Sequence, residues 1–348
     1  MLLSRLRVLE VGPFAELELS FGDEEGPRLA TVLVGGGGTG KTSLLTAIYA
    51  TRPGHALPLG RPWLRPRAAP SFAVADWALD DDDPARPHSL RVASPNVQLD
   101  DPNADDVLRR REQTHFDRQA AQGGFVCVAI SGARWFSRTP VSLSSPERSI
   151  FRYDLRATVA FEDAARSDLA RETKQALSYA AIGAALAGER PEGTAARALD
   201  AAVRGALGPV LSLVDVTYAG ADPVTLEPVF ESPDGASAPF DDLPANVRHL
   251  VALVALPVRA LAGAFPGVDP RQAQGTVLID DADLHQDPAV LRSLVPALRE
   301  SLPRVQWILA SASPALAVGC PASGVLALRR MPASSKVELF EGELALTH

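Results

Sequence analysis

Cysteine is nearly absent: the 348 residues include only Cys127 and Cys320. The two lie far apart in the chain, each within an apolar run, so they do not form the closely spaced ligand pairs of a zinc site. Nor can two cysteines supply the framework of a small disulfide-rich secreted domain. We therefore expect two buried thiols in a reducing compartment.

Positive charge and long apolar runs are also scarce. Lys and Arg total 34 against 42 Asp and Glu, which gives a net charge of −8 and a pI of about 5.3. This balance gives no global basic field for nucleic acid, so DNA binding is possible only through local patches. No run approaches the ~18 apolar residues of a membrane span, and residues 1–12 alternate apolar with polar, unlike a signal peptide. We expect a cytoplasmic protein that does not contact membrane.

A phosphate-binding loop is the strongest motif present. Residues 35–42 read GGGGTGKT, a full match to G-x-x-x-x-G-K-[ST]. Residues 29–34 before it are apolar and β-branched, as in a strand buried on both faces, and residues 43–49 after it are apolar at helical spacing. The alternative is a glycine-rich turn that contains a lysine by chance. The strand before the motif and the helix after it favour a phosphate-binding loop.

The residue types of this loop suit a nucleoside triphosphate. Glycines let the backbone approach the phosphates, so that loop N–H groups and the helix N-terminus face the anion. Lys41 is expected to reach the β- and γ-phosphates, and the Thr42 hydroxyl to bind Mg²⁺. The expected ligands are ATP and Mg²⁺. The expected nucleotide contacts are Gly35, Gly36, Gly37, Gly38, Thr39, Gly40, Lys41, Thr42 and Ser43.

A second motif can complete the site. Residues 275–281 read GTVLIDD, an apolar strand that ends in two carboxylates. Asp280 is the expected Mg²⁺ ligand, directly or through water, and Asp281 the carboxylate that orients or deprotonates the attacking water. Lys41 and Asp281 are thus the expected catalytic residues. Taken alone, two acidic residues after a strand also fit the start of a solvated loop.

The continuation of this segment resembles a known family. Residues 278–288 read LIDDADLHQDP, similar to the LIDEPELHLHP stretch of stand-alone ABC-type AAA family ATPases related to RecF, the overcoming-lysogenization-defect nucleases and structural-maintenance-of-chromosomes (SMC) heads. Residues 2–21 resemble the opening strand pair of that group, residues 240–261 its signature loop and helix, and residues 306–314 its closing strand and switch loop. The resemblance places Asp280 on the Mg²⁺ aspartate and Asp281 on the catalytic glutamate. It also implies that two heads pair around ATP, each phosphate loop facing the partner's signature.

The chain departs from the family pattern in three places. Pro244 and Asn246 replace the usual Ser and Gly of the signature, which weakens a contact to the γ-phosphate across the dimer. Asp281 is one methylene shorter than glutamate, so a water aligned for Glu is held about an ångström off. Ala312 stands where the family's TTHSP pattern has the switch histidine. These departures predict slow hydrolysis.

Other candidates lie on the signature-like helix and after Asp281. Asn246 and Arg248 are candidate contacts to a partner's nucleotide. His285 is a candidate accessory residue, although packing explains it equally, and His249 is expected in a structural or surface role. Either histidine could approach the vacant switch position in three dimensions. Gln98 and Gln113 are the candidates for a Q-loop glutamine, and the spacing does not decide between them.

Two polar clusters carry weaker interpretations. Residues 134–138 read RWFSR and form the best local basic and aromatic patch, suited to stacking or phosphate contacts. The end of a strand at the edge of the core explains that cluster about as well. Residues 80–83 are four aspartates without the glycine and distal glutamate of a calcium loop, so we expect a solvated turn there.

These patterns predict an α/β P-loop NTPase with an ABC-ATPase-type mixed, mostly parallel sheet, an N-terminal antiparallel β segment and a helical insertion. We expect one ABC-type ATPase domain over residues 1–348, with an N-terminal lobe at 1–160, the insertion at 161–210 and a C-terminal lobe at 211–348. Expected strands are 2–11, 14–21, 71–79, 89–94, 125–130, 276–279, 307–310 and 325–328, with a hairpin of 211–218 and 225–230. Expected helices are 105–122, 161–207 with a break at 188–193, and 242–261 with a kink at Pro257.

The predicted function is an ATPase that uses nucleotide-dependent dimerisation or conformational change to regulate a partner. By family analogy the setting is bacterial DNA maintenance or defence against phage and plasmids. The expected assembly is a homodimer or head-to-head pair on ATP, with a protein partner or effector subunit. A second hypothesis is a regulatory or scaffold subunit that binds ATP and scarcely hydrolyses it, which Asp281, Asn246 and Ala312 favour. A transporter ATPase subunit fits the motifs less well.

Overall fold

The computed structural model describes residues 1–23, 26–52, 59, 70–78, 90–94, 126–145, 167–188, 190, 193–332 and 336–347. The expected helix at 105–122, the acidic turn at 80–83 and both Q-loop candidates, Gln98 and Gln113, lie outside these residues. The proposed division into two lobes and an insertion stays a prediction.

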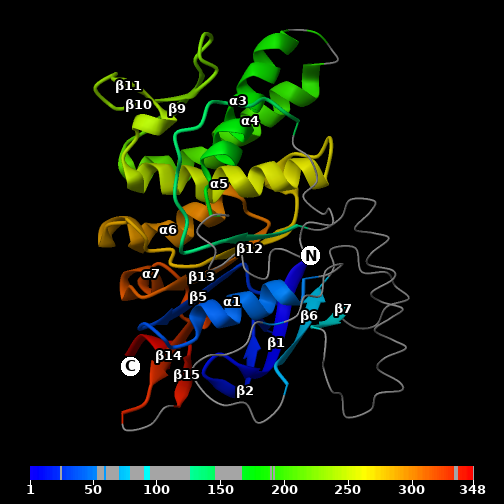
Figure 1. Cartoon of the computed structure of the whole chain (residues 1–348), viewed down its shortest axis with the longest axis vertical. Helices are drawn as coiled ribbons and strands as arrows, with labels where there is room; N and C mark the ends of the chain where they lie inside the picture. Colours follow the sequence, from blue (N-terminus) through cyan, green and yellow to red (C-terminus); the bar gives the residue numbers. More distant parts are fainter. Residues whose placement is uncertain are drawn as a thin grey trace.

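A six-stranded sheet forms the centre of the molecule, in the order β15-β14-β5-β13-β12-β8 (Figure 1). Its strands are β5 (Ala30–Gly35), β8 (Cys127–Ile130), β12 (Gly275–Ile279), β13 (Val305–Ser311), β14 (Val325–Arg330) and β15 (Val337–Glu341). Neighbouring strands are parallel from β14 to β8, and β15 alone is antiparallel to its neighbour. The predicted α/β class with a mixed, mostly parallel sheet is confirmed.

Alternating side chains of this sheet enter two separate cores. In β12, Val277 and Ile279 join the core on the helical side, while Leu278 joins the core beneath the sheet. The same alternation holds in β13, where Trp307 and Ile308 point into opposite cores. A period of two with both faces buried explains why these strands read as continuous apolar runs.

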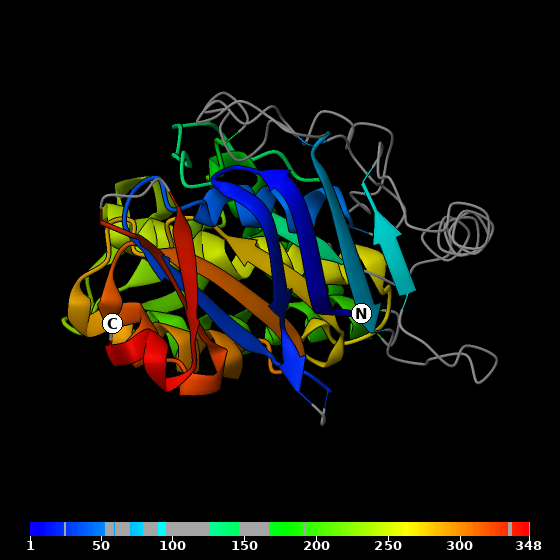
Figure 2. The ribbon, with the colours of Figure 1, turned by 90° about the horizontal axis from the view of Figure 1, so that it is seen from below.

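A second, antiparallel sheet of order β2-β1-β6-β7 lies below the central one. Its strands are β1 (Leu2–Val11), β2 (Phe14–Ser20), β6 (Phe72–Ala78) and β7 (Leu90–Ala93), and a short pair, β3 (Gly22–Asp23) with β4 (Gly26–Pro27), follows β2. The helix α1 (Lys41–Ala50) shares one apolar core with β1, β6 and the lower face of the central sheet. Seen from below in Figure 2, β1 and β2 lie in front of the central strands. The expected N-terminal antiparallel pair is confirmed.

Buried Gln306 joins the two sheets. Its side-chain amide accepts a hydrogen bond from Leu3 N and donates to the carbonyls of Leu3 and Arg28, at 2.7 to 2.9 Å. The Gln306 side chain is fully buried at the start of β13. Because water cannot reach its polar atoms there, these hydrogen bonds within the protein satisfy them.

Helices cover the upper face of the central sheet in two tiers (Figure 1). The elements are α3 (Ala170–Ala187), α4 (Thr194–Leu211), α5 (Ala245–Ala264), α6 (Pro288–Ser301) and the short α7 (Pro314–Val318) and α8 (Glu343–Thr347). Single 3₁₀ turns are η4 (Ser212–Val214), η5 (Phe240–Asp242), η6 (Pro270–Gln272) and η7 (Ala322–Gly324). A hairpin of β9 (Thr217–Ala221) and β10 (Pro228–Glu231), extended by β11 (Ser237–Pro239), flanks α3 and α4.

Several predicted boundaries were wrong for identifiable reasons. Within the segment predicted as helical, α3 begins at Ala170, because Asp168 just before it forms a β-bridge with Trp135. Residues 161–166 of that segment lie outside the described residues. Its second helix, α4, runs to Leu211, since Val210 and Leu211 are buried in the helical core, and the hairpin strand starts only at Thr217.

The helix α5 corrects two further expectations. It begins at Ala245 and not at residue 242, because Pro244 adopts an extended ψ of 150° and residues 240–242 form a 3₁₀ turn. It is also long and apolar enough to cross a membrane by length and composition, so the statement that no segment approaches a span was wrong. In the structure, 72% of its most apolar window is buried inside the protein, as in the core helix of a globular protein. Pro257 lies inside this helix.

A buried lysine connects the helical tiers. Lys174 of α3 is fully buried, and its Nζ lies 2.9 Å from Glu227 Oε1 and 2.9 Å from Asp241 Oδ2. Glu227 belongs to the turn before β10, and Asp241 to the turn just before α5. The ammonium group of Lys174 therefore joins α3 to the hairpin and to the N-terminus of α5 through two ion pairs.

We predict that Lys174→Ala lowers the free energy of unfolding by about 3–5 kcal/mol, because it leaves two largely buried carboxylates without their cation. Lys174→Met retains the packing of the aliphatic stem and isolates the electrostatic part. Urea unfolding followed by circular dichroism measures both.

The matched control is Arg7→Ala. Arg7 pairs with Glu16 at 2.7 Å, but both side chains are about half exposed, so its loss should change stability by less than about 1 kcal/mol. Equal losses at Lys174 and Arg7 would contradict the assignment.

Candidate nucleotide-binding and active site

The phosphate loop connects the end of β5 to the start of α1. Residues 36–38 are exposed at its tip, whereas Thr39 is buried. Gly40 has a φ of +95°, and a Cβ there would lie 2.6 Å from the Phe14 ring and 2.7 Å from Pro13. Only glycine fits this position, because the β1–β2 turn packs directly against the loop. The strand, loop and helix predicted for residues 29–49 are all present.

Polar groups already line the inside of the loop. Lys41 is 7% exposed, and its Nζ donates to the carbonyls of Gly35 at 2.7 Å and Gly36 at 3.0 Å. The Thr39 hydroxyl also donates to Gly36 O, at 2.9 Å. From β14, Arg330 Nη2 donates to Gly38 O at 3.0 Å. The ammonium group is thus held against the loop backbone, where a phosphate ligand would exchange for the carbonyls.

The structure brings the two sequence motifs together. Thr42, in the first turn of α1, donates its hydroxyl proton to Asp280 Oδ2 at 2.9 Å across 238 residues of sequence. The contact follows from the fold, since β5 and β12 both pair with β13 in parallel and their carboxyl ends reach the same edge. Ser43 follows Thr42 on the same turn of the helix.

Asp280 is a buried carboxylate in which, within the described part of the chain, one oxygen is bonded and the other is not. It is 3% exposed, and its Oδ1 has no hydrogen-bond partner among the described residues. Burial raises the pKa of this carboxyl to about 6, against the opposing hydrogen bond from Thr42, and the neighbouring charge of Asp281 raises it further. A carboxylate oxygen without a partner, next to a threonine hydroxyl, is a donor set that suits Mg²⁺. The residues present therefore fit the predicted metal.

Asp281 differs from Asp280 in exposure and backbone. Its side chain is exposed, and its φ of +43° lies in the left-handed region that non-glycine residues rarely adopt. Its carboxylate lies against the loop after β8, so close that a Cβ on Gly132 would lie 2.5 Å from Asp281 Oδ2. The carboxylate is therefore accessible to a ligand and confined on one side.

Arg134 lies inside the site and not on a surface patch. It is 4% exposed and donates to the carbonyls of Ser131 at 2.9 Å, Asp280 at 2.6 Å and Asp281 at 2.8 Å, and to His249 Nδ1 at 3.0 Å. Burial lowers the pKa of this guanidinium to about 10, and the charge of Asp281 is the largest opposing effect, so it stays protonated at neutral pH. Of the two interpretations of residues 134–138, burial rules out the basic and aromatic patch for Arg134 and fits the end of a strand at the edge of the core. At its far end, Arg138 is exposed and pairs with Asp242.

The two histidines considered in the sequence lie together beside this arginine. The rings of His249 and His285 are 4.9 Å apart, and His249 also meets Phe136 edge-on at 5.0 Å. Burial, and then the charge of Arg134, lower the pKa of His249 to about 3. Because Arg134 Nε donates to its Nδ1, His249 carries its proton on Nε2. The structural role expected for His249 fits this burial.

The first turn of α5 holds Asn246 and Arg248. Asn246 O accepts a hydrogen bond from Gln286 Nε2 at 3.0 Å, and the Arg248 guanidinium lies 5.5 Å from the Phe136 ring centre. No hydrogen bond among the described residues joins either residue to the phosphate loop of the same chain. Their role as contacts to a partner's nucleotide stays a prediction. Ala312 is exposed directly after β13, with no polar side chain at the expected switch position.

Sequence reasoning missed three residues of the site: Gly132, Arg134 and Arg330. Gly132 and Arg134 follow β8, the parallel neighbour of β12, and Arg330 ends β14, the parallel neighbour of β5. The available signal was position, because side chains just after parallel strands gather at one edge. The sequence alone does not give the strand order that reveals those neighbours.

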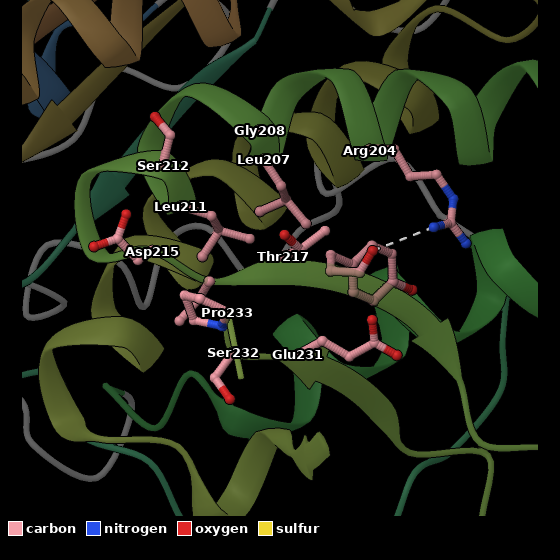
Figure 3. Close-up of a pocket in the computed structure, with 12 residues that line it drawn as sticks. Arg204, Leu207, Gly208, Leu211, Ser212, Asp215, Thr217, Glu231, Ser232 and Pro233 are labelled. Atoms are coloured by element: carbon pink, nitrogen blue, oxygen red, sulfur yellow. Dashed lines mark hydrogen bonds between the residues drawn. The ribbon is translucent and has the colours of Figure 1, made fainter. Parts of the chain in front are cut away.

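A cavity of about 620 Å³ lies elsewhere, between α4 and the β9–β10 hairpin (Figure 3). Its lining includes Arg204, Asp215 and Glu231, and no residue of the phosphate loop or of the turn after β12. Arg204 Nη1 donates to Tyr218 O at 3.2 Å on one side of it. The cavity is separate from the candidate nucleotide site.

We predict that Asp280→Asn stabilises the nucleotide-free protein at high pH. A carboxyl with an unfolded pKa near 3.8 and a folded pKa of about 6 destabilises the fold progressively as pH rises from 4 to 6, and fully above that. The amide should therefore raise stability by about 1–3 kcal/mol at pH 8 and by little at pH 4. Thermal unfolding in EDTA at both pH values measures this. Asp287→Asn, an exposed carboxylate without a side-chain capping bond, should show no such gain, and a pH-independent effect of Asp280→Asn would contradict the prediction.

Comparison with known proteins gives a fold. No family model matches the chain, and no curated protein matches it. A solved SMC head bound to the C-winged helix domain of ScpA is 13% identical, with a TM-score of 0.53 over 100% of both chains. The SMC head domain from Thermotoga maritima is 13% identical, with a TM-score of 0.46 over 98% of this chain and 99% of that one. A Pyrococcus furiosus Smc head with an extended coiled coil, bound to the C-terminal domain of ScpA, is 14% identical, with a TM-score of 0.49 over 99% and 98%.

The fold assignment rests on the first of these structures, the SMC head bound to the C-winged helix domain of ScpA, whose TM-score is 0.53. The sequence resemblance to RecF and to the overcoming-lysogenization-defect nucleases stays a prediction. The chain has the fold of an SMC head domain.

Proposed function

We propose that this protein binds ATP with Mg²⁺ and hydrolyses the β–γ phosphoanhydride bond. One observation carries the proposal: the Thr42 hydroxyl meets the buried Asp280 carboxylate at 2.9 Å, directly beside the exposed Asp281. A phosphate loop, a metal-binding pair and a free carboxylate in one place are the parts that phosphoryl transfer to water requires.

Different residues of the chain bind the phosphates, hold the metal and activate the water. The backbone of residues 35–40 and the N-terminus of α1 bind the phosphate anion, and Lys41 turns from Gly35 O and Gly36 O to the phosphate oxygens. Thr42 and Asp280 would hold Mg²⁺, which when bound neutralises phosphate charge. Asp281 orients the attacking water and accepts its proton.

We further propose that two copies pair around ATP and that nucleotide turnover controls a protein partner in the cytoplasm. Asn246 and Arg248, which make no hydrogen bond to the loop of their own chain among the described residues, are the proposed contacts to the partner copy's phosphates. Protein partnership is supported by the structural neighbour, which was solved with a domain of ScpA. DNA maintenance, or defence against phage and plasmids, is the setting that family analogy favours.

A regulatory subunit that binds ATP and scarcely hydrolyses it is the alternative. The observation that favours it is Ala312: the position after β13 holds an exposed methyl group where a histidine would contact the γ-phosphate. Under this alternative the phosphate loop, Thr42 and Asp280 keep the same binding role, and only turnover is lost.

We predict that wild-type protein hydrolyses ATP with Mg²⁺, and that both Lys41→Ala and Asp281→Asn reduce the rate by about 100-fold or more. Lys41→Ala should also weaken ATP affinity, because it removes a charge on the phosphates, whereas Asp281→Asn should leave affinity nearly unchanged. Steady-state phosphate release and equilibrium ATP binding, each with and without DNA, separate the two effects.

Asp287→Asn is the matched control for Asp281→Asn, since it makes the same change on an exposed carboxylate of the same segment. Tight ATP binding with no turnover under any condition would favour the regulatory subunit. Loss of ATP binding itself in the wild type would overturn both functions.

A further inference from the structure

Arg134 connects three segments that are distant in sequence. Its guanidinium donates to the carbonyls of Asp280 and Asp281 after β12, to Ser131 O after β8, and to His249 on α5. A guanidinium has five N–H donors in a fixed plane, and four of them are used here. Carbonyl oxygens and a neutral imidazole supply all four acceptors, so these bonds fix backbone and helix positions and are not a carboxylate ion pair.

The first consequence concerns the backbone of Asp281. Arg134 donates to the carbonyls of Asp280 and Asp281, one on each side of the Asp281 Cα. Asp280 N also donates to Ile130 O at 2.9 Å, and Ala282 N to Ala310 O at 2.8 Å. These bonds together hold Asp281 at its φ of +43°, a left-handed conformation that is unfavourable for a non-glycine residue. Without the arginine, the Asp280 carbonyl would lose its buried donor, and the Asp281 carbonyl would keep, among the described residues, only the bond from Leu284 N at 3.0 Å.

The second consequence concerns α5. His249 accepts from Arg134 through Nδ1, lies 4.9 Å from His285, and sits one turn after Asn246, whose carbonyl is bonded by Gln286. The turn after β12 therefore contacts the first two turns of α5 directly at two points, through His285 and Gln286. Arg134, from the loop after β8, adds a third link to the same helix. The N-terminus of α5 carries Asn246 and Arg248, the residues proposed to contact the partner copy's nucleotide.

We propose that Arg134 is a positioning residue that holds Asp281 in its working orientation and ties the nucleotide site of one copy to the helix that serves the site of the other. The proposal rests on the proposed ATPase function. Arg134 acts through the Asp281 backbone and through His249, and it does not touch substrate.

The positioning role of Arg134 requires the planar guanidinium group, whose N–H donors point in several fixed directions. Lysine in its place keeps a positive charge near Asp280, Asp281 and Asp283, but a single ammonium cannot reach both carbonyls and the imidazole in the same geometry. Methionine fills a similar length and removes the charge and every donor. Arg138→Met is the matched control, because Arg138 belongs to the same segment but is exposed and pairs only with Asp242 among the described residues.

Hydrogen exchange of the nucleotide-free protein tests the physical tie. We expect Arg134→Met to accelerate exchange in residues 280–286 and 245–250 by about tenfold or more, and Arg134→Lys to do so less, while residues 41–50 of α1 exchange as in the wild type. Arg138→Met should change none of these segments. Unchanged exchange after β12 and in α5 overturns the proposal, and so does an equal acceleration everywhere, because that pattern reports general destabilisation.

Kinetics test the catalytic consequence. A misplacement of about 1 Å costs about 100-fold in rate, so Arg134→Met should lower kcat by that order with KM for ATP within about threefold. In the Asp281→Asn background, Arg134→Met should cause little further loss, because both changes then act on one function. Multiplicative losses, or a change in KM with an unchanged kcat, would show that Arg134 does not act through Asp281.

The two readouts separate this inference from the function on which it rests. If the wild type binds ATP and does not hydrolyse it, the proposed ATPase fails, and the exchange experiment still decides whether Arg134 ties the turn to α5. If the wild type turns over and the Arg134 variants match it in both rate and exchange, the ATPase stands and the positioning role is overturned.

Discussion

The site depends on the parallel register of β5, β13, β12 and β8. Parallel strands present their carboxyl ends at one edge, and here that edge gathers the phosphate loop, the acidic pair and the loop after β8. Backbone hydrogen bonds hold these strands, and the two apolar cores above and below them fix which residues face each side. The 2.9 Å contact between Thr42 and Asp280 is the direct result of that register.

The same edge also carries two features that destabilise the chain without a ligand, a buried charge and a strained backbone conformation. Asp280 is buried with one oxygen unpartnered among the described residues, and Asp281 is held at a positive φ. Each feature destabilises the nucleotide-free chain, and each prepares a group for a ligand, as is common at functional sites. Arg134 offsets part of this destabilisation. Its protonated guanidinium attracts the charges of Asp280 and Asp281 and donates hydrogen bonds to the backbone carbonyls of both residues.

The sequence predicted the parts of the fold whose signals are local. The phosphate loop, the strand before Asp280 and the N-terminal strand pair each lie within a few consecutive residues, and each was found where expected. For residues 134–138 the sequence left two interpretations open, a basic and aromatic patch or the end of a strand at the edge of the core. Three of the four groups to which Arg134 donates lie more than a hundred residues away, directly after β12 and on α5. Lys174 was missed for the same reason, since only the packed helices reveal two carboxylates around it.

Asp281 and Ala312 depart from the sequence pattern of the ATPases that the chain resembles, and the geometry of the site shows what each departure changes. A shorter carboxylate reaches less far, so its position depends more on the backbone that carries it than a glutamate's would. That backbone is held by Arg134 on its carbonyls and confined by Gly132 against its side chain. In the proposed hydrolysis, fewer groups would be left to align the water, because Ala312 follows β13 in place of a histidine. The precision of the site therefore rests on the loop after β8, whose residues contact Asp281 directly and reach α5 through His249.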